Sequence, residues 1–167
     1  MSLQLGIPLF VLSALLQATV LPFWRVFGGQ PDLIVLLVLA WASLDPGQEG
    51  MVWAFVGGLF LDLLSGAPIG ISSLSLVPVA YLIGVTEAQV YRSNVLLTLV
   101  MMTGGALAYH VGYMILLRFL TDYPAAWSEA FRYVTLPSVV FDAILALPVV
   151  YLIRRWYDRL HPRRVAI

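Results

Sequence analysis

Three ionisable side chains lie inside or at the end of long apolar stretches, where an isolated charge is costly. Asp62 ends one stretch, and His110 and Asp142 lie near the middle of two later ones. A carboxylate or an imidazole in such a place forms hydrogen bonds, pairs with an opposite charge or passes protons along. Each of the three therefore has a structural and a functional interpretation.

Asp62 comes just before a turn-rich segment, Ser65-Gly66-Ala67-Pro68-Ile69-Gly70. The structural interpretation is that its carboxylate accepts hydrogen bonds from backbone amides of this turn or of a neighbouring helix start, which would fix a corner. The alternatives are a contact with a partner protein and a role in proton handling. The pattern favours the corner and leaves both alternatives open.

Asp142 lies where an ionised carboxylate is hardest to stabilise, so we expect it to be protonated or paired. His110, which follows Tyr109, is a candidate partner. A neutral, hydrogen-bonded pair would specify how two helices pack. The alternative is a polar pocket that holds a ligand or a proton relay, and one Asp with one His is weak support for it.

The chain offers little for catalysis or metal binding. It has no Cys and no Lys, and the other histidine, His161, is in the C-terminal tail. Ser72 lacks the strand–turn–helix context of a nucleophile elbow. His110 and Asp142 alone are too few ligands for a metal ion. We therefore expect no catalytic residue, cofactor or metal, and interpret the protein as a non-enzyme.

The composition indicates a membrane protein. Charged residues make up 11% of the 167 residues, whereas soluble domains carry roughly a quarter. Residues 1–24, 63–86 and 93–117 contain no charge at all. This excludes a soluble catalytic domain, and a net charge of zero gives no reason to expect nucleic acid binding.

Six apolar segments predict an all-α, polytopic bundle that forms a single transmembrane domain. A spanning helix needs about 20 residues, so the second segment is short and a re-entrant loop remains its alternative. The first segment has neither the basic n-region nor the cleavage site of a signal peptide, so we expect it to be retained. The predicted spans are residues 3–21, 33–44, 50–64, 71–86, 94–117 and 134–153.

The arginines predict the orientation, because cytoplasmic flanks carry the excess of positive charge. Five of the nine are in the tail, residues 154–167, which we expect to be cytoplasmic. With six spans the N-terminus is then cytoplasmic as well. With a re-entrant second segment, five crossings would place the N-terminus outside.

Small residues recur every four positions in several spans, a pattern that allows helices to approach closely in lipid. We expect these stripes to hold the protein's own bundle together, and the alternative is that one receives a partner's transmembrane helix. The stripes are Gly50, Ala54, Gly58 and Asp62; Ala80, Gly84 and Ala88; Gly104, Ala108 and Gly112; and Ser138, Asp142 and Ala146.

Two segments have the character of interfacial anchors. In the loop 118–133, Trp127 and Phe131 lie four residues apart, which suits a short helix in the membrane interface. The tail begins with Arg154, Arg155 and Trp156, which predict aromatic and lipid-headgroup contacts. Either segment could instead bind a partner protein.

The central motif resembles that of the rod shape-determining protein MreD family. The run from Gly57 to Gly70, followed by Leu74 and Ala80-Tyr81-Leu82, carries the resemblance. It extends to Pro31-Asp32-Leu33 at the start of a short second span, and to a proline-containing last span that ends in arginines. On this basis we expect a corner, or partner surface, formed by Gly57, Gly58, Asp62, Pro68 and Gly70.

The resemblance implies a non-catalytic component of the bacterial elongation machinery in the inner membrane. Such proteins bind the bitopic protein MreC and support a RodA-type glycosyltransferase with its class B penicillin-binding protein, guided by MreB. The family is also similar in fold to the substrate-binding subunits of energy-coupling-factor transporters. A transport subunit, with Asp142, His110 and Trp127 lining an outward-open pocket, is therefore the alternative. A flippase for lipid-linked precursors would need a large polar cavity, which so few charges do not favour.

Overall fold

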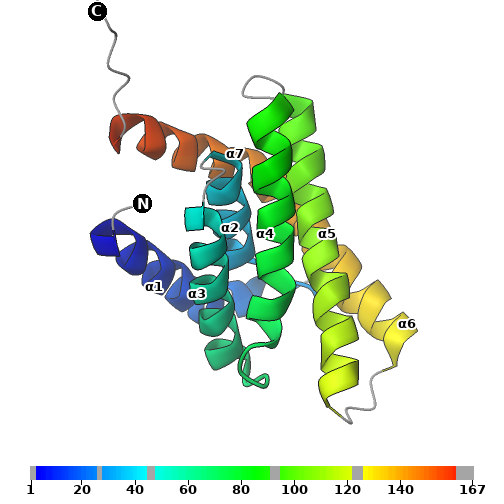
Figure 1. Ribbon diagram of the computed structural model, residues 1–167. Coiled ribbons are helices and arrows are strands. Elements are labelled where there is room, and N and C mark those ends of the chain that lie inside the picture. The colour runs from blue at the N-terminus through cyan, green and yellow to red at the C-terminus, as the bar shows by residue number, and fades with distance from the viewer. Residues whose placement is uncertain (1–2, 26–27, 45–47, 91–94, 122–125, 161–167) are drawn as a thin grey trace, which may run out of the picture.

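The computed structural model describes residues 3–25, 28–44, 48–90, 95–121 and 126–160 (Figure 1). The described residues form helices and no β-strand, in agreement with the predicted all-α class. Residue 94 of the fifth predicted span and residues 161–167 of the predicted tail lie outside these ranges. The helices are α1 (Leu3–Thr19), η1 (Leu21–Trp24), α2 (Leu33–Leu44), α3 (Gln48–Ser65), α4 (Ile71–Val90), α5 (Val95–Leu120), α6 (Trp127–Ala130), η2 (Phe131–Thr135) and α7 (Leu136–Leu160).

Helix α2 is the centre of the bundle. Every residue from Ile34 to Ala42 is buried, and the helix packs against α1, α3, α4, α5 and α7. A helix that is apolar on all sides is stable only when other helices surround it. The 12 residues of α2 therefore form the core of the protein.

The surrounding helices expose many large apolar side chains. Leu12 and Leu15 on α1, Leu82 on α4 and Ile144 on α7 are each more than half exposed. A water-soluble protein rarely presents such extensive apolar surface, whereas lipid accommodates it. By length and composition, two helical stretches could cross a membrane, Val95–Leu120 and Trp127–Arg159, and shorter apolar helices accompany them.

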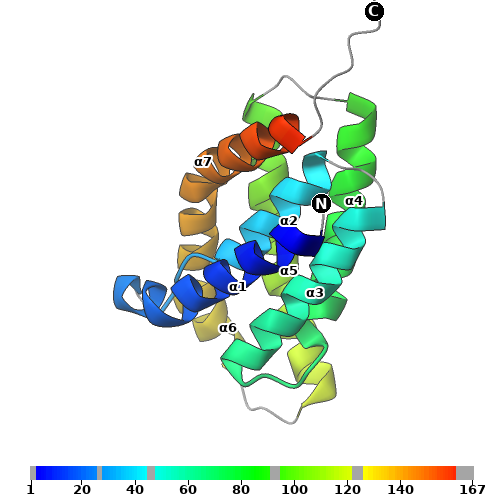
Figure 2. The same ribbon diagram turned by 90° about the vertical axis from the view of Figure 1, so that its left-hand side faces the viewer.

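Successive helices run in opposite directions, so their ends gather at two ends of the bundle. The end of α3, the start of α4, the end of α5 and α6 all lie at the lower end in Figure 1, and α7 ends at the opposite end. Helix α7 changes direction part-way (Figure 2). Pro148 lies within α7, and a proline inside a helix bends it because it removes a hydrogen bond and clashes with the preceding turn.

The segment before α7 differs from the sequence prediction. We expected a short, separate helix in the loop 118–133, but α6 continues through the π-helical turn η2 directly into α7. Glu129 and Arg132 are exposed on the helix surface and do not interrupt it. Pro137 would clash with the carbonyl four residues earlier in a regular helix, and the wider turn at Phe131–Thr135 relieves that clash.

Candidate functional site: a buried acid–histidine cluster beside a pocket

The start of α2 and the helices α5 and α7 bring two carboxylates and one imidazole together inside the bundle. Asp32 precedes α2, His110 is on α5 and Asp142 is on α7. The His110 Nε2 atom lies 3.4 Å from Asp32 Oδ2 and 3.7 Å from Asp142 Oδ2. The sequence analysis considered His110 and Asp142 as a pair. The structure adds a third residue, Asp32, whose carboxylate lies closer to His110 than that of Asp142 does.

Asp142 is fully buried, and its Oδ1 atom accepts a hydrogen bond of 2.8 Å from the Asp32 backbone N–H. The first amides of a helix have no partner within the helix, and a carboxylate at that end is also favoured by the helix dipole. Asp142 therefore joins the start of α2 to α7.

Gln17 on α1 holds the same helix start from the other side. Its Nε2 donates a hydrogen bond of 2.5 Å to Asp32 Oδ1, and its Oε1 accepts one of 3.2 Å from the Ile34 N–H. Gln17 is buried with Phe10 and Ala14 on the face of α1 that packs against the bundle. One amide side chain thus fixes both the Asp32 carboxylate and the backbone beside it.

A cavity of about 610 Å³ borders the cluster. Its volume is in the range of pockets that bind small molecules. Arg25 and Arg118 are also on its wall; Arg25 Nε donates to Gln30 Oε1 at 2.9 Å, and the Arg118 guanidinium lies 5.5 Å from the centre of the Trp127 ring. The polar part of the lining includes Gln17, Asp32, Ser72, His110, Tyr113 and Ser138.

The pocket differs in one respect from the alternative considered from the sequence. His110 and Trp127 line the pocket, as that alternative requires. Asp142 is fully buried and does not line it, whereas Asp32 does. Sequence reasoning missed Asp32 because a charge at the edge of an apolar segment is typical of a membrane interface. It missed Gln17 because an uncharged side chain does not interrupt an apolar stretch.

The corner between α3 and α4 forms the opposite wall. Asp62 Oδ2 accepts a hydrogen bond of 2.6 Å from the Gly70 N–H, and Oδ1 accepts one of 3.1 Å from the Ser72 N–H. These are the backbone contacts that the sequence favoured for this carboxylate. Gly70 adopts a φ of 104°, a conformation that side chains disfavour, so the turn requires glycine there.

The corner residues differ in their exposure. Gly57, Gly58 and Asp62 are buried in the protein's own packing, and a Cβ atom on Gly58 would lie 2.4 Å from the Ser73 backbone. Pro68 is exposed and Gly70 is half-buried. Gly58 and Asp62 hold α3 against the start of α4. Gly57 instead faces Phe10 on α1 and Val38 on α2.

In three of the four stripes of small residues, every residue whose burial the structure describes is buried. The stripe on α3 is buried throughout, as are Ala80 and Gly84 on α4 and the α7 stripe of Ser138, Asp142 and Ala146. The burial of Ala88 lies outside the described residues. The α5 stripe differs, because Gly104 and Ala108 are exposed and a Cβ atom on Gly104 would meet no described atom within 4 Å. Its third member, Gly112, is half-buried, and a Cβ atom there would lie 3.6 Å from the Ser75 hydroxyl on α4.

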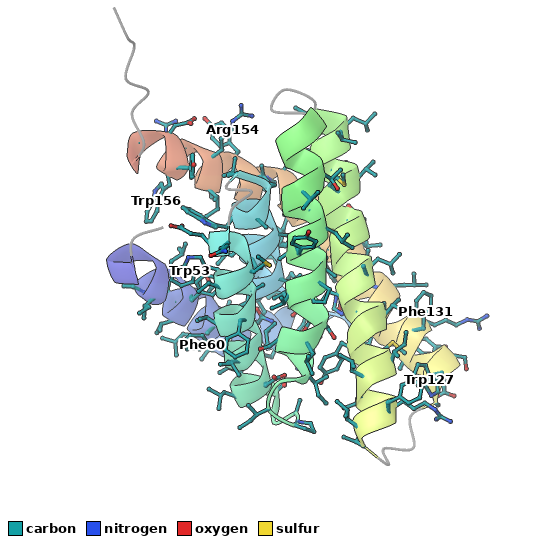
Figure 3. The ribbon with its side chains drawn as sticks, viewed as in Figure 1. Trp53, Phe60, Trp127, Phe131, Arg154 and Trp156 are labelled. Carbon is teal, nitrogen blue, oxygen red and sulfur yellow. The ribbon has the colours of Figure 1, made fainter. Side chains whose placement is uncertain are left out.

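The expected anchor residues lie at opposite ends of the molecule (Figure 3). Trp127 and Phe131 are at the lower end, and Arg154 and Trp156 are near the end of α7. Arg155 donates a hydrogen bond of 3.3 Å to the Tyr151 hydroxyl. Aromatic residues at both ends are typical of a protein that spans a bilayer.

A family model described as rod shape-determining protein MreD matches residues 1–160. The chain belongs to the MreD family. Its members are structural membrane proteins that take part in determining rod shape, and they are not a known enzyme family. No solved structure matches this chain, so the similarity in fold to energy-coupling-factor subunits stays a prediction.

Proposed function

We propose that this MreD-family protein is a non-catalytic scaffold of the cell-elongation machinery that binds the transmembrane helix of an MreC-type bitopic protein. Through that partner it supports the RodA-type glycosyltransferase and its class B penicillin-binding protein, alongside MreB. It acts by binding this partner and thereby fixing the partner's orientation within the membrane.

The observation that carries the proposal is the exposed stripe on α5. Leu96, Val100, Gly104 and Ala108 recur every four residues along one exposed face. Small residues at the centre let a second helix approach closely, and the apolar residues before them add van der Waals contact. The described small residues of the other stripes are used within the bundle, which makes α5 the best candidate face.

The orientation belongs to the same proposal. With six spans and both termini in the cytoplasm, the end of α7 with Arg154 and Arg155 faces the cytoplasm. The lower end in Figure 1, with Trp127 and the cavity, then faces outward. This arrangement follows the positive-inside tendency.

Co-purification of the bitopic partner tests the proposal. We compare wild type with Gly104→Leu and Gly58→Leu in detergent, and measure both partner recovery and thermal unfolding of the protein alone. Gly104→Leu should lose at least 10-fold of partner recovery at unchanged stability, because its side chain has room within the chain but obstructs a neighbouring helix. Gly58→Leu should unfold at lower temperature, because it clashes with Ser73. Full partner recovery with Gly104→Leu would contradict the proposed face.

The cavity supports a second candidate function, that of a small-molecule-binding transport subunit. Its volume of about 610 Å³, with His110 and Trp127 on its wall, is adequate for a small ligand. Native mass spectrometry of the purified protein separates the two candidates. A transport subunit should retain a stoichiometric small molecule and require an energising ATPase, whereas the scaffold should retain its bitopic partner without added ligand.

A further inference from the structure

We propose that Asp32, His110 and Asp142 bind one divalent transition-metal ion of the Zn²⁺ class at the floor of the cavity. Each residue offers one ligand atom, and these atoms all lie within 4.8 Å of one another. In a tetrahedral site with metal–ligand bonds of about 2.0–2.1 Å, neighbouring ligand atoms lie about 3.4 Å apart. The distances of 3.4 Å and 3.7 Å from His110 Nε2 to the two carboxylates are close to this value.

Two atoms of the cluster lack the hydrogen bonds that burial normally demands. Asp142 is 0% exposed, and its Oδ2 has no hydrogen-bond partner among the described residues, nor has His110 Nε2. A buried polar atom without a partner is destabilising, and each such case calls for an explanation. Both atoms are among the three candidate ligand atoms of the cluster. A metal ion bound between these ligand atoms would give each of the two atoms a partner.

The charge of the cluster also favours a divalent cation. Two carboxylates with a neutral imidazole carry two negative charges, which a divalent ion neutralises and a monovalent ion does not. The arginines on the cavity wall have other contacts, Arg25 with Gln30 and Arg118 with Trp127. The imidazole favours zinc or a similar transition metal over Mg²⁺ and Ca²⁺, which prefer oxygen ligands.

The outer hydrogen bonds direct one oxygen of each carboxylate to the centre. Asp142 Oδ1 accepts from the Asp32 N–H, and Asp32 Oδ1 accepts from Gln17, so each Oδ2 remains for the ion. Such supporting contacts orient metal ligands in known sites. Three protein ligands leave a fourth position for a water molecule on the side of the cavity. An ion here would fasten α2, α5 and α7 to one another.

Zinc binding to the purified full-length protein tests the site. The protein carries a purification tag without histidine, is stripped with a chelator and is dialysed against micromolar Zn²⁺ before elemental analysis. We expect one zinc ion per chain, a higher unfolding temperature with zinc than without, and no displacement by excess Mg²⁺. Asp142→Asn and His110→Gln should each weaken zinc binding at least 10-fold.

Two variants serve as matched controls. His161→Gln removes the other histidine of the chain, and Asp158→Asn removes an exposed carboxylate on α7, so both should keep the zinc. Absence of stoichiometric zinc in wild type, or zinc affinity unchanged in the Asp142 and His110 variants, overturns the proposal. If those variants do not fold, X-ray absorption of the zinc-loaded wild type decides: one imidazole among oxygen ligands supports the site, and any other ligand set overturns it.

Discussion

Asp62 is a single side chain that satisfies two backbone amides, those of Gly70 and Ser72, across the corner between α3 and α4. Its burial is almost complete, with 1% of its surface exposed. The Ser72 hydroxyl in turn accepts a hydrogen bond of 3.3 Å from Tyr109 on α5. One carboxylate thus connects the corner to the wall of the cavity.

Substitution of Asp62 tests this role. Asp62→Leu leaves both amides without an acceptor, and we expect a loss of about 2–4 kcal/mol in the free energy of unfolding. Asp62→Asn keeps one acceptor oxygen, so its free energy of unfolding should lie between those of wild type and Asp62→Leu. Thermal unfolding in detergent measures the effect, with exposed Asp158→Asn as the control. An Asp62→Leu protein as stable as wild type would show that the corner does not depend on these bonds.

Gly70 tests the backbone of the same corner. At a φ of 104° it has open space around a Cβ atom, so Gly70→Ala costs only backbone strain, about 1–2 kcal/mol. Gly66→Ala, at a φ of 68°, should cost less, because the ordinary left-handed region is easier for alanine to adopt. The same unfolding measurement compares them, and an equal or reversed order contradicts this ranking.

Residue types alone could predict some of this chemistry and not the rest. The contacts of Asp62 are local in sequence, so the neighbouring turn indicated them. The cluster joins residues 110 positions apart, Asp32 and Asp142, through their packing around α2. Sequence reasoning found two of its three members from their apolar surroundings, but Asp32 resembles an ordinary residue at the start of a helix.

Among the elements, the core helices were the most predictable. The bounds of α2 agree with the predicted 33–44 because Asp32 and Asp45 enclose an uninterrupted apolar run. Helix α7 was the least predictable at its start, because charged residues on an exposed helix surface resemble a loop in sequence. The π-helical turn before Pro137 depends on backbone sterics that hydropathy does not report.

The seam between α3 and α4 yields a prediction at this scale. Gly58 lies so close to Ser73 that even alanine requires the two helices to separate, and Ser73 Oγ also donates a hydrogen bond of 2.9 Å to the Phe55 carbonyl. We expect Gly58→Ala to lower the free energy of unfolding by about 1–3 kcal/mol. Gly104→Ala on the exposed face of α5 is the control and should leave stability unchanged or slightly higher. Thermal unfolding of both variants gives the comparison.

For the whole molecule, the proposed orientation places the end of α7 in the cytoplasm and α6 on the outer side of the membrane. The chain has no cysteine, so single-cysteine variants can be labelled without background. With six spans, Ser128→Cys should react with a membrane-impermeant thiol reagent in intact cells, and Asp158→Cys should react only after the membrane is opened. Both sites are exposed in the structure, so differences in labelling report the side of the membrane. The reverse pattern would invert the proposed orientation.

Site-specific photo-crosslinking on α5 in living cells shows directly whether the protein holds a partner's transmembrane helix. A photoreactive residue at Ala108 lies on the exposed stripe, and one at Ile144 lies on the exposed surface of α7 as a matched control. We expect a crosslink to the bitopic MreC-type protein from position 108 and none from position 144. A crosslink from position 144 alone, or none from position 108 while the partner still co-purifies, would contradict this expectation.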